Sequence, residues 1–205
     1  MNLQPAEQRR LQQRQGARRA ILDATEALLV EEGYDVFSMR KLAERCGYTP
    51  PTIYHYFGDK RGLIDALLEE RFQKLYDRLR RVRLGDDPVQ NLRELARAFV
   101  RFCLRNPVHY RLLYAPRPNG VKPPPSREAL LELGEGMLRS LAEEGRLRLE
   151  VRAANQALYV TLHGVISLRN ESADIEWVSG LPDLAIDSML RGLVRGVPEG
   201  DGRAE

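Results

Sequence analysis

The sequence predicts an all-α fold. Apolar residues recur at helical spacing along most of the 205 residues, for example at Leu63, Leu67 and Leu68. Clusters of Gly, Asp and Pro, such as Gly85-Asp86-Asp87-Pro88, divide these helical segments from one another. The alternation that is typical of a strand is confined to Leu147-Arg148-Leu149, which is too short to form one.

Composition indicates a soluble globular protein, with 43% hydrophobic and 30% charged residues. Because no run approaches the roughly 18 apolar residues of a membrane span and no apolar signal core begins the chain, we expect a cytoplasmic protein with no membrane partner. Cys46 and Cys103 both fall in helical patterns, which favours two buried thiols over a disulfide. A formal net charge of +3 does not by itself indicate nucleic acid.

Residues 38–60 spell two short helices joined by a tight turn. Ser38 is a suitable N-cap for the first helix, and Gly47 supplies the left-handed conformation that a sharp turn between helices requires. Thr49 is a suitable N-cap for the second helix. Pro50 and Pro51 then occupy first-turn positions, where an N–H would have no intrahelical partner.

The second of these helices has an apolar side and a polar side. Ile53 and Phe57 are four residues apart and can pack inward, whereas Thr52, His55 and Tyr56 point away from that core. Hydroxyl and imidazole groups suit phosphates and base edges. Residues 38–61 also hold five basic residues against two acidic ones. The segment is therefore interpreted as a helix-turn-helix whose second helix recognises DNA.

The order Tyr48-Thr49-x-Pro51-Thr52-Ile53-Tyr54-x-Tyr56-Phe57-x-Asp59-Lys60, preceded by Leu42-Ala43 and Gly47, is similar to the DNA-binding domain of the tetracycline-repressor (TetR) family of bacterial transcription regulators. The resemblance covers about residues 17–68. It implies a homodimer that binds a palindromic double-stranded DNA operator and that a small ligand releases. Gly62 stands where the family usually has a helix-favouring polar residue, so we expect a looser first turn there.

The resemblance and the residue chemistry together assign roles in DNA binding. The expected phosphate contacts are Ser38, Tyr54 and Lys60, with the alternative that Tyr54 is a packed aromatic. The expected base-edge contacts are Arg40, Thr49, Thr52, His55 and Tyr56, while Pro50 or Pro51 would touch a thymine methyl group.

The predicted domains are a flexible arm over residues 1–16, a helix-turn-helix DNA-binding domain over 17–62, a helical ligand-binding and dimerisation domain over 63–196 and a disordered tail over 197–205. The arginines of the arm would either enter a minor groove or remain solvated. A basic stripe further along the chain would either face DNA or form a solvated helix face, and it is made of Arg71, Lys74, Arg78, Arg80, Arg81 and Arg83.

Two long helices, from about Glu150 to Asn170 and from Pro182 to Val194, are apolar on more than one side. The surplus apolar surface predicts a partner, and the family resemblance implies a homodimer through these last two long helices. Tyr159 to Gly164 also resembles a subgroup named for a Trp, His and Gly motif, with Tyr159 where the Trp is expected.

A small hydrophobic ligand is expected in the second domain. The candidate contacts are Tyr110, Tyr114, Tyr159, His163, Arg169 and Trp177. For His163 the alternative is a core or interface histidine, and for Trp177 an anchor at the dimer seam.

Nothing in the sequence predicts an enzyme. The three histidines lack metal-ligand spacing, there is no Cys-x-x-Cys, and Gly134-Glu135-Gly136 lacks the strand and the third glycine of a dinucleotide loop. We therefore expect no catalytic residue, no metal and no cofactor. The alternatives are an activator or a DNA-organising protein with no small-molecule ligand, or a helical enzyme.

Overall fold

The computed structural model describes residues 5–114, 123–172 and 174–197. This part of the chain is all-α, as predicted, and its only strand-like feature is an isolated antiparallel bridge between Leu147 and Val194. The nine described helices are α1 (Pro5–Glu32), α2 (Met39–Cys46), α3 (Pro50–Phe57), α4 (Lys60–Leu79), α5 (Pro88–Arg105), α6 (Pro107–Tyr114), α7 (Pro125–Glu143), α8 (Val151–Glu171) and α9 (Leu181–Leu193).

The chain forms two compact units. Unit 1 comprises Met1–Arg71 and Arg111–Pro124, and unit 2 comprises Phe72–Tyr110 and Pro125–Glu205. Two helices, α4 and α6, carry residues of both units. This division differs from the predicted boundary at residue 62, because α4 continues without interruption beyond it.

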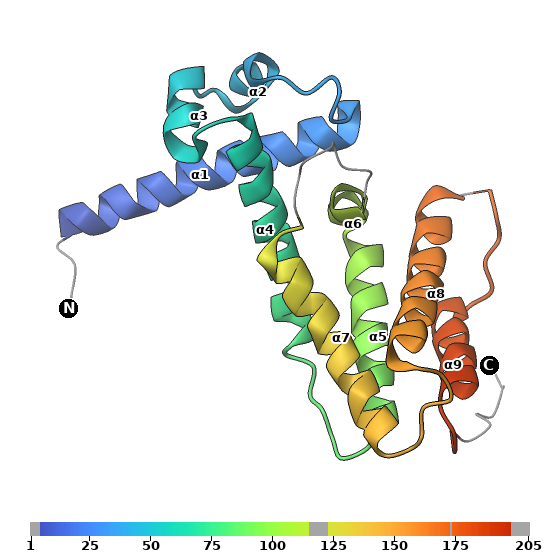
Figure 1. Cartoon of the computed structure of the whole chain (residues 1–205). Helices are drawn as coiled ribbons and strands as arrows, with labels where there is room; N and C mark the ends of the chain where they lie inside the picture. Colours follow the sequence, from blue (N-terminus) through green and yellow to red (C-terminus); the bar gives the residue numbers. More distant parts are fainter. Residues whose placement is uncertain (1–4, 115–122, 173, 198–205) are drawn as a thin grey trace. The chain divides into compact units, whose positions relative to one another are not determined.

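Unit 1 is built on α1. The helices α2 and α3 lie above α1 in Figure 1, with α1 in contact with α2 and α2 with α3. Its buried core draws one apolar face from each helix and includes Ile21, Leu22, Leu42, Ile53, Leu63 and Leu67. Burial of these side chains, each contributing about 1.5–3 kcal/mol, holds the short helices in place.

Unit 2 is a bundle in which α5 contacts α7, α8 and α9, and α8 contacts α7 and α9 (Figure 1). The side chain of Asp87 caps α5 by accepting a hydrogen bond from the backbone N–H of Val89. Apolar packing is supplemented by ion pairs between α5 and α9, namely Arg93 with Asp187 at 2.7 Å and Arg97 with Asp183 at 2.6 Å.

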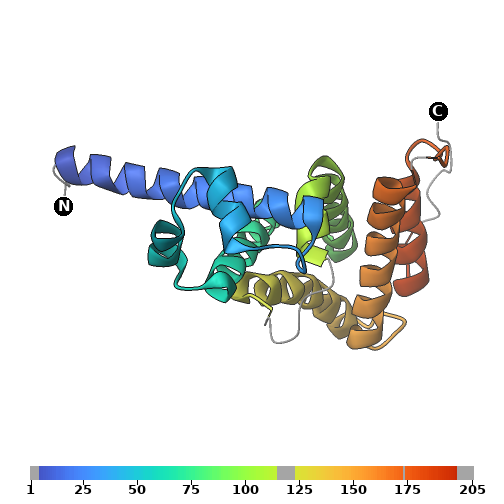
Figure 2. The ribbon, with the colours of Figure 1, turned by 90° about the horizontal axis from the view of Figure 1, so that it is seen from above.

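The N-terminal segment differs from the prediction of a flexible arm. Residues 5–16 continue α1 as helix, and the side chains of residues 6–16 are all exposed. In both views the first turns of α1 extend past α2 and α3 (Figures 1 and 2). The physical reason is that Gln, Arg, Ala and Leu favour helix, so the packed part of α1 propagates into a segment that buries nothing. Residues 1–4 and the predicted tail from residue 198 onward lie outside the described residues.

Candidate nucleic-acid interface

The turn between α2 and α3 has the geometry that the sequence predicts. Ser38 Oγ accepts a hydrogen bond from the backbone N–H of Lys41 at 3.3 Å, which caps α2. Gly47 has φ 73°, and its N–H donates to the carbonyl of Ala43 at 3.0 Å. Since side chains other than Gly are strained at this φ, Gly47 fixes the reversal of the chain.

Two apolar anchors and two ion pairs hold α2 and α3 against α1. Leu42 and Ile53 are fully buried. Arg45 forms two hydrogen bonds with Glu31, of 2.5 and 2.7 Å, and Lys41 lies 2.6 Å from Glu32. Each contact joins α2 to the end of α1. The orientation of α3 within unit 1 is therefore set by its buried face, which leaves its polar face outward.

The outward face of α3 carries the predicted base-reading residues. Two of these residues, Thr52 and Tyr56, are half-buried. The exposed ones are Thr49, Pro50, Pro51, Tyr54 and His55. The hydroxyls of Thr49 and Thr52 lie 2.9 Å apart, although Thr49 makes no side-chain hydrogen bond to the helix backbone. The rings of His55 and Tyr56 meet edge to face at 5.8 Å. These contacts orient the polar groups before any ligand arrives.

The predicted cations flank this face differently. Arg40 is 90% exposed and pairs only with its neighbour Glu44, at 3.1 Å. Lys60 Nζ donates to the carbonyl of Phe37 at 2.7 Å and lies 5.1 Å from the centroid of the Phe37 ring. An ammonium group has three donors, so Lys60 keeps two for a phosphate. The internal contact holds its head group near the start of α2.

Gly62 is tightly enclosed, and the expectation of a looser first turn in α4 is corrected. Asp59 Oδ1 accepts from the N–H of Gly62 at 2.7 Å, which caps the helix. A Cβ added at Gly62 would lie 2.2 Å from the carbonyl oxygen of Phe57. The last turn of α3 and the first turn of α4 thus approach more closely than any larger residue permits.

Arg71 is buried, which corrects its assignment to a basic surface stripe. Its side chain is 1% exposed and forms ion pairs with Glu26 at 2.9 Å, Asp23 at 2.5 Å and Glu70 at 2.7 Å. Burial by itself lowers the pKa of Arg71, but the nearby carboxylates raise it above its usual value. The guanidinium therefore stays charged and joins α4 to α1 inside unit 1.

Unit 2 brings together three of the six predicted ligand contacts. Tyr110 Oη lies 3.1 Å from His163 Nδ1, and the rings of Tyr159 and His163 are 4.0 Å apart. Phe99, which the sequence did not single out, lies edge-on to His163 at 5.5 Å. Burial lowers the pKa of His163 to about 4, with a smaller contribution from Arg127. Burial likewise raises the pKa of Tyr110 to about 12. We call these four residues, all of them aromatic, the His163 cluster; near pH 7 His163 and Tyr110 are uncharged.

The other three predicted contacts are placed elsewhere. Trp177 is half-buried between α8 and α9, where its Nε1 donates to the carbonyl of Ser172 at 3.3 Å. Arg169 is exposed near the end of α8. Tyr114 ends α6 in the segment that belongs to unit 1.

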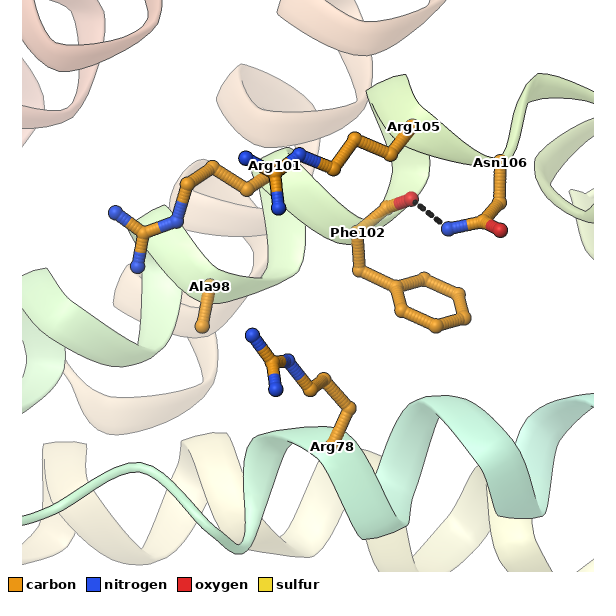
Figure 3. Close-up of a pocket in the computed structure, with 6 residues that line it drawn as sticks. All are labelled: Arg78, Ala98, Arg101, Phe102, Arg105 and Asn106. Atoms are coloured by element: carbon orange, nitrogen blue, oxygen red, sulfur yellow. Dashed lines mark hydrogen bonds between the residues drawn. The ribbon is translucent and has the colours of Figure 1, made fainter.

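A pocket of about 280 Å³ opens in unit 2 between the end of α4 and α5, where no site was predicted. It is lined by Arg78, Ala98, Arg101, Phe102, Arg105 and Asn106 (Figure 3). Three of these six residues are arginines. We call this feature the arginine pocket.

The described residues offer little for other chemistry. No group of three or more His, Cys, Asp or Glu side chains among them is placed to hold a metal ion. None of the helices in this part of the chain has the length and apolarity to cross a membrane. Cys46 and Cys103 are free thiols, and burial raises the pKa of Cys103 to about 12, so it is unreactive near neutral pH.

Comparison with known families assigns both halves of the chain. Residues 21–67 match the model described as bacterial regulatory proteins, tetR family, and residues 92–193 match the tetracyclin repressor-like C-terminal domain. Membership of the subgroup that is named for a Trp, His and Gly motif stays a prediction.

Individual relatives agree with this assignment. The chain is 28% identical over 186 residues to the class D tetracycline repressor protein of Escherichia coli, covering 90% of this chain and 81% of that protein. It is 35% identical over 92 residues to the HTH-type transcriptional repressor KstR of Mycolicibacterium smegmatis, covering 44% of this chain and 45% of that protein.

The fold is also that of a solved regulator. NalD of Pseudomonas aeruginosa, the secondary repressor of the MexAB-OprM multidrug efflux pump, superposes with a TM-score of 0.73 at 23% identity, over 91% of this chain and all of NalD. The helix-turn-helix, the helical C-terminal unit and both family matches lead to one conclusion: this chain belongs to the tetR family of bacterial transcription regulators, proteins that act by binding DNA and not as enzymes.

Proposed function

We propose that the protein is a transcriptional repressor that binds a palindromic operator as a homodimer and is released by a small ligand. The observation that carries the proposal is the exposed polar face of α3: a fully buried Ile53 anchors this helix, and ion pairs join the preceding helix α2 to α1. A rigid helix with outward hydroxyl and imidazole groups is suited to the major groove.

Within this proposal, one set of side chains contacts phosphates and another contacts bases. Tyr54, Ser38 and Lys60 hold phosphates and set the depth of α3, which contributes affinity without sequence information. Thr49, Thr52, His55, Tyr56 and Arg40 face base edges, and Pro50 or Pro51 contacts a thymine methyl group. The exposure of Tyr54, at 44%, supports a phosphate contact over a packed aromatic.

The helical N-terminus changes what its arginines would contact. An α-helix is about 10–12 Å across with its side chains, whereas the minor groove of B-DNA is only about 6 Å wide. The exposed turn that carries Arg9, Arg10 and Arg14 would therefore lie along flanking phosphates. Deleting residues 1–15 is expected to weaken binding to all sequences and to reduce its salt dependence. Unchanged affinity and salt dependence would assign these residues to solvent.

The homodimer is proposed to form through α8 and α9. One face of α8 carries Val160, Gly164, Ser167 and Leu168. Val160 is 68% exposed, and a Cβ added at Gly164 would have no heavy atom within 4 Å. On α9, Leu184 and Gly192 are exposed eight residues apart. Exposed apolar and small residues at this spacing fit a helix-to-helix seam between two copies.

A two-residue change tests the seam. Val160→Asp with Leu168→Asp is expected to convert dimer to monomer in sedimentation equilibrium, because two charges would be buried on each side of the two-fold axis. Val108→Asp on α6, also exposed and apolar, serves as the matched control. Dimers of undiminished stability in the double variant would move the interface elsewhere.

Ligand release is proposed to begin at the His163 cluster. Its aromatic side chains suit an apolar compound, the kind of ligand that the sequence predicts. Tyr110 belongs to unit 2, while the next residue, Arg111, belongs to unit 1 and donates to the carbonyl of Val30 at the end of α1. A ligand that displaces Tyr110 would therefore act one residue from a contact of the DNA-binding unit. It releases DNA only if it binds the DNA-free form more tightly.

Selection of duplexes from a random pool tests the proposal as a whole. The expected product is a palindrome whose half-sites are about 34 Å apart, one turn of DNA, or a multiple of that distance. Enrichment of no sequence, with equal affinity for all duplexes, would favour a DNA-organising protein. Enrichment of a single half-site would overturn the homodimer.

A further inference from the structure

The arginine pocket lies within unit 2, between α5 and the end of α4. Arg78 reaches from α4 toward α5, and the ring of Phe102 reaches from α5 toward α4 (Figure 3). Arg101 and Arg105 are one turn apart on α5. Asn106, the C-cap of α5, donates from Nδ2 to the carbonyl of Phe102 at 2.8 Å.

The arginines of α5 fall into two sets with different environments. Arg93 and Arg97 pair with Asp187 and Asp183 of α9 at 2.7 and 2.6 Å. Arg101 and Arg105 make no ion pair with a carboxylate anywhere in the described chain, and neither does Arg78 across the pocket. The first half of this arginine stripe on α5 is thus neutralised by carboxylates of α9, whereas its second half, at the pocket, has positive charge without a counter-charge among the described residues.

Three guanidinium groups around one cavity attract an anion. Arginine presents its donors in a planar fork that matches the oxygens of a carboxylate or a phosphate. Such an anion would also relieve the mutual repulsion of the three like charges. The volume of about 280 Å³ is just below the usual range of small-molecule sites, so the occupant is small.

The rest of the lining is apolar. Ala98 is buried and the Phe102 ring is half-buried, and both border the same cavity as the guanidinium groups. A bare inorganic ion would leave the Phe102 ring in water, whereas a molecule with an apolar body would cover it.

We propose that the arginine pocket binds a small amphipathic oxyanion, with a carboxylate or phosphate head at Arg78, Arg101 and Arg105 and an apolar body against Phe102 and Ala98. The inference rests on the proposed function only in that this anion would be an effector of the regulator. It adds an anionic ligand class, at a site separate from the His163 cluster and its proposed apolar ligand.

Calorimetric titration of the full-length protein with octanoate, octyl phosphate, 1-octanol and inorganic phosphate tests the class. The proposal expects one saturable site per chain for octanoate or octyl phosphate, with affinity that falls as salt rises. The two octyl anions separate a carboxylate source from a phosphate source. Three results would overturn the proposal. The first is that 1-octanol binds as tightly as octanoate, and the second is that neither octyl anion shows saturable binding. The third is that inorganic phosphate binds as tightly as octyl phosphate.

Variants locate the site. Arg101→Gln with Arg105→Gln is expected to weaken binding of the preferred octyl anion by at least about tenfold, through loss of charge-assisted hydrogen bonds. Arg81→Gln removes one positive charge three residues beyond Arg78, at a residue that does not line the pocket, and it should leave the binding unchanged. Because all three arginines are exposed, the variants should keep the thermal midpoint of the parent. Wild-type affinity in the double variant, or equal weakening in Arg81→Gln, would place the anion elsewhere.

DNA binding is measured separately, on the duplex selected from the random pool. If the octyl anion binds while no duplex is preferred, the pocket stands and the repressor proposal fails. If a duplex is preferred while no octyl anion binds, the repressor proposal stands and the proposal for the arginine pocket fails.

Discussion

The helix-turn-helix and the pair α8 and α9 differ in what they leave exposed. The outward face of α3 is polar, with Thr49, Tyr54 and His55 exposed, and a fully buried Ile53 holds the opposite face of the helix. The outward face of α8 and α9 is apolar, with Val160, Leu168 and Leu184 exposed. The first surface suits a charged, hydrated partner such as DNA, and the second suits a copy of itself. Both units have a buried apolar core and ion pairs between helices, so the difference lies in the surface that each presents.

The largest expected effect comes from Arg71→Met. The substitution leaves Glu26 buried without its cation, which should lower the free energy of unfolding by about 3–5 kcal/mol. Arg19→Met removes an exposed pair with Asp23, 3.8 Å away, and should cost less than about 1 kcal/mol. Urea denaturation followed by far-UV circular dichroism measures both. A loss below 1 kcal/mol for Arg71→Met would show that the buried network does not stabilise unit 1.

Gly62→Ala is expected to have the next largest effect. The added Cβ would clash with the carbonyl oxygen of Phe57, so the free energy of unfolding should fall by about 1–3 kcal/mol. Gly136→Ala in α7 is the matched control in unit 2, because nothing lies within 4 Å of the added Cβ. There the same change should stabilise by about 0.4–1 kcal/mol. Stabilisation at both glycines would contradict the close approach of α3 and α4.

A smaller effect is expected from pH on unit 2. The pKa of His163 is about 4 in the folded protein against an ordinary 6.5, so the unfolded chain binds the additional proton between these values. The stability contributed by neutral His163 is present above pH 6.5 and is lost as pH falls toward 4. Trp177 fluorescence in unit 2 should report a lower urea midpoint at pH 5 than at pH 7, and His163→Gln should reduce that difference. An undiminished pH dependence in the variant would assign it to other groups.

The smallest expected effect is that of Lys60→Ala on DNA binding. Loss of one phosphate contact should weaken binding to all duplexes and reduce the slope of log affinity against log salt by about 0.9. Because Lys60 also donates to the carbonyl of Phe37, the thermal midpoint is measured beside it. Arg152→Ala, an exposed cation on α8, should leave the slope unaltered. A lower midpoint with an unchanged slope would make Lys60 a structural residue only.

The sequence predicted those parts of unit 1 that depend on neighbours within about four residues. The Ser38 cap, the Gly47 turn and the buried Ile53 follow from such local rules, and the structure confirms them. The role of Gly62 was missed because the carbonyl that excludes a Cβ belongs to Phe57, in the last turn of the preceding helix.

Long-range pairings were harder to predict. Arg71 meets Glu26 and Asp23 across 45 and 48 positions of chain, and no periodicity separates a buried arginine from a solvated one. Tyr110 and His163 were both predicted as ligand contacts, but their hydrogen bond to one another and the contribution of Phe99 were not predicted. The arginine pocket combines residues of two helices, of which only Arg78 had been singled out, as part of a surface stripe.

The central claim, that α3 reads bases, is tested most directly by the ratio of affinities for the selected duplex and for a scrambled duplex of equal length and composition. The wild-type protein should prefer the selected duplex by at least about 10³-fold at physiological salt. His55→Ala combined with Thr52→Ala should collapse this preference while leaving affinity for the scrambled duplex almost unchanged. Equal affinity of the wild-type protein for both duplexes, or a preference that survives in the double variant, would contradict the account.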